Sequence, residues 1–139
     1  SGSELCRPCS PNSHSVAASA SVLMCLCNKG FTGENGGTCV SCAQGTYKAV
    51  NASAACSTCP DNSYSPPASV AQTACTCNAG FTGPDGTLCL ACDSGTYKIM
   101  TGTGTCANCP PESHSANAST QLSNCTCNAG WDTLHPNDG

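Results

Sequence analysis

Charged and aromatic side chains are scarce in this sequence. Only 9% of its 139 residues are charged and 4% are aromatic. A domain of this length normally buries a core of Leu, Ile, Val and Phe. So few large apolar side chains cannot offset a backbone entropy cost of about 1–2 kcal/mol per ordered residue. The composition therefore excludes an ordinary globular core and requires another source of stability.

Basic residues and long apolar runs are also missing. Four Lys and Arg stand against eight Asp and Glu, for a formal net charge of −4. Because no basic cluster is present to neutralise phosphates, we expect no nucleic-acid partner. The most apolar patch, Val22-Leu23-Met24, is far shorter than the roughly 20 residues of a membrane helix. We therefore expect no membrane insertion of this segment.

Cysteine is what the chain has in place of these residues, with sixteen in all. A content above roughly 8–10% is typical of a disulfide scaffold. Disulfides persist in oxidising compartments, so we predict a secreted or extracellular protein. Zinc held by paired thiolates and redox catalysis at Cys-x2-Cys are the alternatives. Nothing else in the sequence supports either of them, and we expect no metal and no cofactor.

The cysteines recur with a period of 50 residues, together with several Gly, Ser, Tyr and Lys positions. The first copy has Cys6, Cys9, Cys25, Cys27, Cys39 and Cys42, the second has Cys56, Cys59, Cys75, Cys77, Cys89 and Cys92, and the third begins with Cys106, Cys109, Cys125 and Cys127. Such a period is typical of a tandem repeat protein. We assign a partial repeat to residues 1–41, a complete repeat to 42–91, and a repeat with a divergent last loop to 92–139.

The third copy departs from the pattern after Gly130. Gly139 stands where the period places the partner of Cys127, and Asp138-Gly139 matches the earlier turn sequences with a three-residue displacement. The chain also begins at Ser-Gly-Ser, without an initiating Met or a signal peptide. We expect the native polypeptide to be longer than this sequence, and Cys127 to lack its partner here.

Helical periodicity is absent, and Gly and Pro interrupt every candidate helix. The turn sequences Glu34-Asn35-Gly36-Gly37 and Pro84-Asp85-Gly86, flanked by short β-compatible runs, predict hairpins whose arms are clamped by disulfides. The loops Ser10–Met24, Pro60–Ala74 and Pro110–Asn124 are predicted to be irregular. The fold class is small and disulfide-rich: tandem cysteine-rich repeats with short β-hairpins, irregular loops, almost no helix and an elongated rod shape.

Fourteen cysteines are predicted to form disulfides, and the spacing leaves two schemes open. They are Cys9, Cys25, Cys27, Cys39, Cys42, Cys56, Cys59, Cys75, Cys77, Cys89, Cys92, Cys106, Cys109 and Cys125. The local scheme pairs Cys42–Cys56 and Cys59–Cys75, whereas the crossed scheme pairs Cys42–Cys59 and Cys56–Cys75. Both share a Cys77–Cys89 bond. Each closed loop of about 15 residues contributes roughly 3 kcal/mol in the chain-entropy model.

The cysteine motifs resemble those of a known extracellular family. The order is Cys-x-Cys-x2-Gly-Phe, then Cys-x2-Cys-x2-Gly-Thr-Tyr-Lys, then Cys-x2-Cys-Pro. It is similar to the cysteine-rich, EGF-like region of ephrin receptors, and the resemblance covers Cys6 to Gly130. The resemblance implies a rod-like spacer or adhesion array without catalysis. No kinase, transmembrane or ligand-binding domain accompanies it, so a receptor identity does not carry over.

Two smaller resemblances bear on pairing and on calcium. The stretches from Cys42 to Tyr47 and from Cys92 to Tyr97 resemble the first small module of tumour necrosis factor receptor repeats, where the bond is local. This resemblance favours the local scheme. Calcium-binding EGF modules carry an acidic cluster before their first Cys, whereas Val40-Ser41 and Leu90-Ala91 stand in that place. Calcium is therefore not expected.

Five residues are candidate glycosylation sites. Asn51, Asn117 and Asn124 lie in Asn-x-Ser/Thr sequons, the last with Cys125 at its centre. Thr32 and Thr82 lie in Gly-Phe-Thr-Gly, which resembles an O-glycosylation motif of EGF modules. The alternative for both Thr residues is a hairpin shoulder, where Thr serves strand propensity.

No catalytic residues are predicted, because no nucleophile, base and acid combine in a recognisable set. His14 and His114 share a repeat position with Tyr64, and we interpret it as a packing position. We likewise expect Phe31, Phe81 and Trp131, which also share a repeat position, to cover junctions between modules. Two functions remain open: a structural rod, stalk or filament subunit that associates with its own copies, and a ligand-binding or adhesion module of a receptor.

Overall fold

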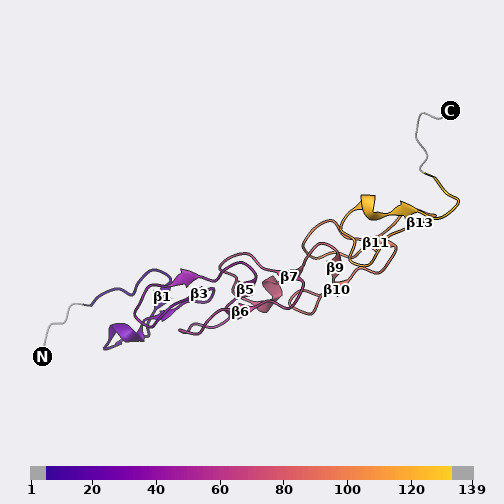
Figure 1. The fold of residues 1–139 in the computed structure, drawn as a ribbon. Coiled ribbons are helices and arrows are strands. Elements are labelled where there is room, and N and C mark those ends of the chain that lie inside the picture. The colour runs from indigo at the N-terminus through magenta and orange to yellow at the C-terminus, as the bar shows by residue number, and fades with distance from the viewer. Residues whose placement is uncertain (1–5, 133–139) are drawn as a thin grey trace, which may run out of the picture. The chain divides into compact units, whose positions relative to one another are not determined.

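The computed structural model describes residues 6–132. Figure 1 shows a chain made mainly of loops with a few short strands. Every strand in the described range is two residues long, and each pairs antiparallel with one neighbour. The pairs are β1 (Ser13–His14) with β2 (Leu26–Cys27), β3 (Phe31–Thr32) with β4 (Val40–Ser41), β5 (Thr46–Tyr47) with β6 (Ser57–Thr58), β7 (Ser63–Tyr64) with β8 (Thr76–Cys77), β9 (Phe81–Thr82) with β10 (Leu90–Ala91), β11 (Thr96–Tyr97) with β12 (Ala107–Asn108), and β13 (Ser113–His114) with β14 (Thr126–Cys127).

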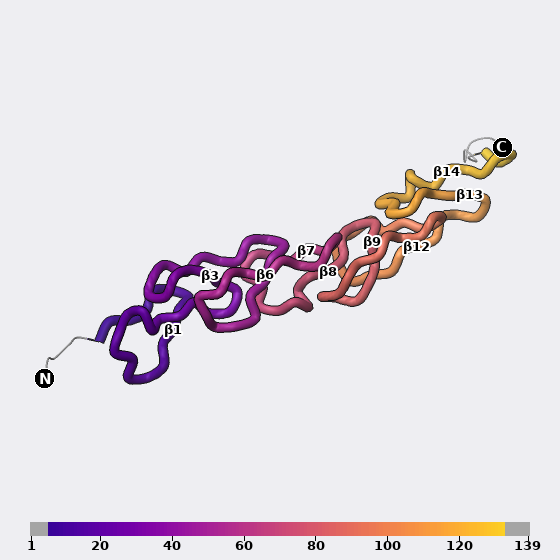
Figure 2. Tube along the Cα trace, turned by 60° about the horizontal axis from the view of Figure 1, so that its bottom comes forward, coloured from indigo at the N-terminus to yellow at the C-terminus, as the bar shows by residue number. Residues whose placement is uncertain are grey.

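In the described residues, helical structure is limited to three single turns of 3-10 helix: η1 (Val22–Met24), η2 (Gln72–Ala74) and η3 (Leu122–Asn124). They stand at one repeat position. Most of the remaining backbone follows loops, as the trace in Figure 2 shows. The predicted fold class, small and disulfide-rich with short β-hairpins and almost no helix, is confirmed.

The chain folds as two compact units. One contains Ser1–Cys59 and Ser65–Ala74, and the other contains Pro60–Tyr64 and Cys75–Gly139. These units do not follow the repeat boundaries, because part of the second copy, residues 65–74, packs within the first unit. The boundaries at 41/42 and 91/92 describe the sequence repeat and stay a prediction.

Disulfides form the core of both units. Among the described residues, the buried hydrophobic side chains are all half-cystines: Cys25, Cys27, Cys39, Cys42, Cys59, Cys75, Cys77, Cys89 and Cys92. Large apolar side chains lie on the surface instead, including Leu90, Ile99 and Met100 at 62–74% exposure. Covalent bonds thus replace the apolar core that the composition could not supply.

The cysteine pairing follows the local scheme. The bonds are Cys9–Cys25, Cys27–Cys39, Cys42–Cys56, Cys77–Cys89, Cys92–Cys106 and Cys109–Cys125. Cys59 and Cys75 are disulfide-bonded as well. Within the part of the chain that the structure describes, Cys6 and Cys127 are the free cysteines.

The hairpins differ in detail from the prediction. The arms of the second-copy hairpin are β9 and β10, and Cys89 lies directly before β10. Cys77 belongs to a different ribbon, β7–β8, so the Cys77–Cys89 bond links two ribbons rather than two arms of one hairpin. The loops predicted to be irregular each contain a two-residue strand and one 3-10 turn. Elements this short carry no periodic signal.

Within residues 6–132, no helix is long and apolar enough to cross a membrane.

Candidate functional site

In each unit, one contact of the same geometry joins two segments that lie about twenty residues apart in the sequence. In the first unit, residues 65–70 lie on residues 42–48, which have the sequence Cys-x2-Gly-Thr-Tyr-Lys. We call residues 65–70 and their equivalents 115–120 the docked loops, and residues 42–48 and 92–98 the receiving segments. Three backbone hydrogen bonds join them: Gly45 N to Ser65 O at 2.8 Å, Lys48 N to Ser69 O at 3.0 Å, and Ala68 N to Cys42 O at 2.9 Å.

The second unit repeats this contact with the same groups. Gly95 N donates to Ser115 O at 3.0 Å, Lys98 N to Ser119 O at 3.0 Å, and Ala118 N to Cys92 O at 2.9 Å. The side chains follow the same pattern, since Ser65 Oγ donates to Thr46 O and Ser115 Oγ to Thr96 O. Equivalent atoms therefore form the same hydrogen bonds in both units, as expected of a tandem repeat protein.

Glycine is required where each docked loop touches the preceding hairpin. A Cβ on Gly80 would lie 2.5 Å from Ala118 O, and a Cβ on Gly30 would lie 2.5 Å from Ala68 O. Both glycines also have a left-handed φ, near +80°. The close approach of backbone to backbone explains why these positions are Gly in the sequence.

We predict that Gly80→Ala weakens the contact by about 2–4 kcal/mol, from a left-handed φ and from the displaced loop. Gly95→Ala is the matched control, because Gly95 has φ +82° but nothing within 4 Å of its Cβ position. This control should lose only about 1 kcal/mol. Hydrogen exchange at the Ala118 amide measures the difference, and equal exchange in the two variants would contradict the close contact.

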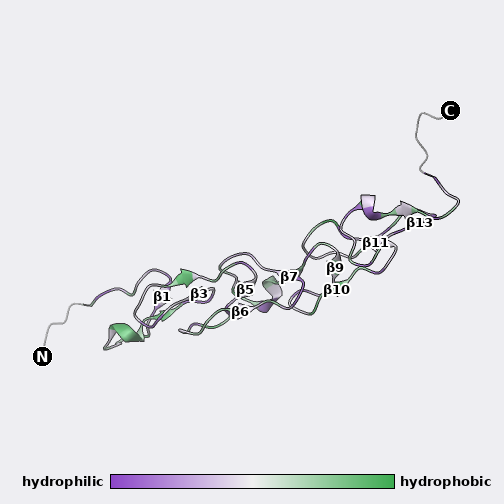
Figure 3. Ribbon diagram, viewed as in Figure 1, coloured by the Kyte–Doolittle hydropathy of each residue, from purple (hydrophilic) through white to green (hydrophobic). Residues whose placement is uncertain are grey.

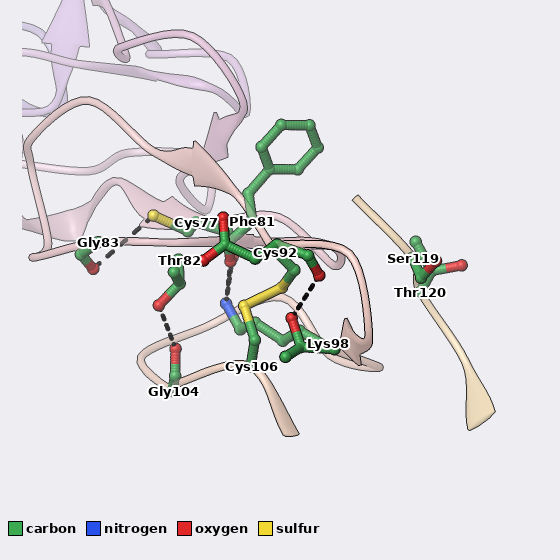
Figure 4. The surroundings of a disulfide bond; sticks show 12 residues. Cys77, Phe81, Thr82, Gly83, Cys92, Lys98, Gly104, Cys106, Ser119 and Thr120 are labelled. Carbon is green, nitrogen blue, oxygen red and sulfur yellow. Dashed lines mark hydrogen bonds between the residues drawn. A yellow bond between two sulfur atoms is a disulfide. The ribbon is translucent and has the colours of Figure 1, made fainter. Parts of the chain in front are cut away.

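Lys48 and Lys98 are buried, with exposed fractions of 2% and 7%. Lys98 Nζ donates to the carbonyl oxygens of Cys77, Phe81 and Gly102 at 3.1, 2.9 and 2.6 Å. Figure 4 shows this side chain beside the Cys92–Cys106 disulfide, with its nitrogen directed at Phe81. An ammonium has three N–H groups, so three carbonyls satisfy it completely.

The ammonium of Lys48 has the same surroundings in the first unit. Its carbonyl partners are Cys27 at 3.3 Å, Phe31 at 2.7 Å and Ala52. Burial lowers the pKa of Lys48. Burial also lowers the pKa of Lys98, and the negative charge of Asp85 opposes that shift. Each lysine ties a hairpin to the following loop. In the sequence, Lys48 and Lys98 stand out only as a repeated position, and no pattern there predicts their burial.

The hydroxyls of Thr32 and Thr82 are engaged by backbone carbonyls. Thr32 Oγ1 donates to Ala54 O at 3.0 Å, and Thr82 Oγ1 donates to Gly104 O at 3.0 Å (Figure 4). Both residues lie in strands, β3 and β9. A sugar on either oxygen would displace this hydrogen bond. The geometry therefore favours the hairpin-shoulder interpretation over O-glycosylation.

The three sequon asparagines are exposed. Asn51 Oδ1 accepts a hydrogen bond from Lys29 N at 2.9 Å. Asn124 Oδ1 accepts from Thr120 N and Gln121 N, each at 3.1 Å. Both amides bond through the oxygen, whereas a glycan attaches to the nitrogen. These hydrogen bonds are therefore compatible with glycosylation.

The packing prediction for the His/Tyr position is wrong. His14, Tyr64 and His114 are all exposed. His114 Nδ1 lies 2.8 Å from Asn128 Oδ1, and His14 Nδ1 bonds in the same way to Asn28. At this position the histidine side chains form polar contacts with a nearby Asn at the surface, where β1 and β13 lie. The occurrence of His and Tyr at one repeat position does not distinguish a surface site with a polar contact from a buried packing position.

The described range contains no cluster of side chains suited to a metal ion. No group of three or more His, Cys, Asp or Glu side chains lies close enough to hold a metal ion there. One wide, open hollow of about 470 Å³ is lined by Thr32, Gly33, Glu34, Asn35, Ser53 and Ala55. Glu34 is the one ionisable side chain in this lining.

Comparison with known proteins gives one family match. Residues 29–75 match the family model described as tyrosine-protein kinase ephrin type A/B receptor-like. The search of curated proteins finds no match. The matched segment contains the hairpin β3–β4, Lys48 and the docked loop 65–70, and it repeats with the 50-residue period. Fourteen bonded cysteines indicate an oxidising, extracellular or secretory environment. Residues 29–75 are thus an ephrin receptor-like cysteine-rich module, of a typically non-catalytic kind.

Proposed function

We propose that this chain is a non-catalytic segment of an extracellular structural array: a glycosylated rod, stalk or filament subunit that associates with its own copies. The repeated contact between a docked loop and a receiving segment carries this proposal. Gly30 meets Ala68 O and Gly80 meets Ala118 O at the same distance, 2.5 Å from the Cβ position. A binding site is expected to be concentrated in one divergent copy, whereas a structural array repeats its contacts.

Surface composition supports the same proposal. The chain has few charges, and Leu88, Leu90, Ile99 and Met100 are at least 60% exposed. Such side chains suit lateral packing between copies. Imaging native material by electron microscopy tests this directly, and we expect ordered filaments or sheets. Monodisperse single chains at the native concentration would count against it.

Glycans are expected on Asn51 and Asn117, which are exposed sequon residues, and at lower occupancy on Asn124, whose sequon contains the bonded Cys125. Peptide mapping before and after treatment with a peptide N-glycosidase measures this through the Asn-to-Asp conversion. Thr32 and Thr82 serve as internal comparisons and should remain unmodified. Unmodified Asn51 and Asn117 in native material would remove the glycan part of the proposal.

A receptor-type binding module is the second candidate, and one observation favours it. The 3-10 turn η1 is apolar and exposed in the first copy, with Val22 at 63% and Leu23 at 64%. Figure 3 shows η1 in green and η3 in purple and white. Beside η1 lies a hollow of about 270 Å³ lined by His14, Ser15, Val16, Met24 and Leu26. If this function holds, Leu23→Ser abolishes ligand capture while leaving assembly unchanged.

A further inference from the structure

One serine position differs in burial among the three copies. Ser65 and Ser115 have exposed fractions of 0% and 4%, whereas Ser15 is exposed. In the second and third copies this serine is covered by a receiving segment, and its Oγ donates to Thr46 O or Thr96 O. The exposure of Ser15 therefore marks a surface that a receiving segment covers elsewhere in the chain.

Backbone groups at this surface also lack the partners that their equivalents have. In both docked loops, the first serine O accepts from Gly N, the alanine N donates to Cys O, and the second serine O accepts from Lys N. The corresponding groups of the first copy are Ser15 O, Ala18 N and Ser19 O. Within residues 6–132, no backbone partner stands opposite them. These three backbone groups have the same sequence spacing as the groups by which the docked loops bind the receiving segments. A segment that binds them therefore needs the donors and acceptor of a receiving segment.

The first-copy loop, residues 15–20, already has the docked conformation. Ala18 has φ 61°, as Ala68 has φ 61° and Ala118 has φ 60°. Ser19 Oγ bonds to Val16 O, as Ser69 Oγ bonds to Pro66 O. A left-handed alanine is unfavourable by about 1–2 kcal/mol, yet the loop keeps it without the contact. Docking therefore requires little reordering of this loop.

Cys6 also indicates that a receiving segment would bind at this surface. It is exposed and free. Its repeat equivalents, Cys56 and Cys106, bond to Cys42 and Cys92. These two cysteines are the first residues of the receiving segments. The equivalents of Cys6 and of residues 15–20 thus both bind the receiving segment Cys-x2-Gly-Thr-Tyr-Lys in the other copies.

We propose that Cys6 and residues 15–20 form a docking site for a further Cys-x2-Gly-Thr-Tyr-Lys segment, carried by a cysteine-rich module of this kind. The segment donates two backbone N–H groups to Ser15 O and Ser19 O and accepts from Ala18 N. Its cysteine arrives as a mixed disulfide with a small thiol such as glutathione. The Cys6 thiolate attacks the sulfur of that cysteine, a disulfide to Cys6 forms, and the small thiol leaves as a thiolate. The proposal deepens the proposed function by naming the partner of the array, but it depends only on the contact between a docked loop and a receiving segment and not on filament formation.

The test uses the folded chain and a peptide with the sequence of residues 42–55, its single Cys carried as a mixed disulfide with glutathione. The Cys6 thiolate attacks the peptide sulfur, the peptide–glutathione bond breaks, and glutathione leaves as a thiolate. Cys127 competes as the second free thiol of the same chain. Peptide mapping should show about tenfold more peptide on Cys6 than on Cys127, from two to three backbone hydrogen bonds.

The matched control peptide carries N-methyl groups on the residues equivalent to Gly45 and Lys48, which removes both donors and keeps every side chain. It should react with Cys6 and Cys127 in a ratio set by thiol exposure alone. Equal Cys6-to-Cys127 ratios for the two peptides would overturn the proposal. In the Cys6 adduct, hydrogen exchange at the Ala18 amide should slow by about tenfold or more, and unchanged exchange would also overturn it. If the peptide shows no preference for Cys6 while native material forms filaments, only the docking site is rejected. If the peptide prefers Cys6 but no filaments form, only the structural array is rejected.

Discussion

Reduction of the disulfides is expected to unfold the chain completely. The buried hydrophobic side chains in the described residues are all half-cystines, and large apolar side chains such as Leu90, Ile99 and Met100 lie on the surface. Without the bonds, no apolar burial remains to oppose the entropy of a free chain. Amide chemical-shift dispersion and hydrogen exchange, with and without a reductant, measure the change. Retained dispersion after full reduction would show that packing rather than cross-linking holds the fold.

A single bond can be removed to locate this effect. Cys92→Ala combined with Cys106→Ala opens a loop with a sequence separation of 14 and should lower local stability by about 3 kcal/mol. The exchange of the Ala118 amide, which donates to Cys92 O, should accelerate by about a hundredfold as a result. The matched control is Cys6→Ser with Cys127→Ser, because neither residue is bonded. We expect no loss of stability in that control.

Lys98→Met is expected to destabilise the second unit by about 2–3 kcal/mol. Methionine retains the apolar stem but leaves the carbonyls of Cys77, Phe81 and Gly102 without their donor. Each buried acceptor that loses its partner costs about 1–3 kcal/mol, partly offset because no charge is then buried. Exchange at the Gly80 amide, which donates to Lys98 O at 2.9 Å, should accelerate by a corresponding factor of about 30–150.

Lys29→Met is the control for this variant, since Lys29 is exposed and its loss should change stability by less than about 0.5 kcal/mol. The pH dependence gives a second readout. Burial lowers the pKa of Lys98, so between its folded and unfolded pKa the unfolded chain binds more protons. Stability should therefore rise with pH across that alkaline window in the native chain, with Cys6 and Cys127 alkylated. Lys98→Met should lack the part of this rise that Lys98 contributes. An unchanged rise would contradict the assignment.

Much of the fold follows from composition and spacing. The scarcity of apolar and charged residues required cross-links, and the 50-residue period in Cys, Gly and Tyr defined one unit repeated along the chain. The hairpin turns at Asn35-Gly36 and Asp85-Gly86 were predicted because few sequences favour a left-handed φ. These features are local or covalent, and for that reason a sequence expresses them directly.

The sequence alone determined the class of this protein: a disulfide-rich extracellular-type repeat with a known module at residues 29–75. Only the tertiary structure decided the pairing of Cys42 with Cys56 rather than Cys59, and the burial of Lys48 and Lys98. It also showed that the Thr82 hydroxyl donates to a backbone carbonyl and that Ser15 is exposed. The lysine and threonine contacts depend on which backbone carbonyls these side chains meet across the loops of the chain. No periodicity records such meetings, because each partner is a main-chain group common to every residue.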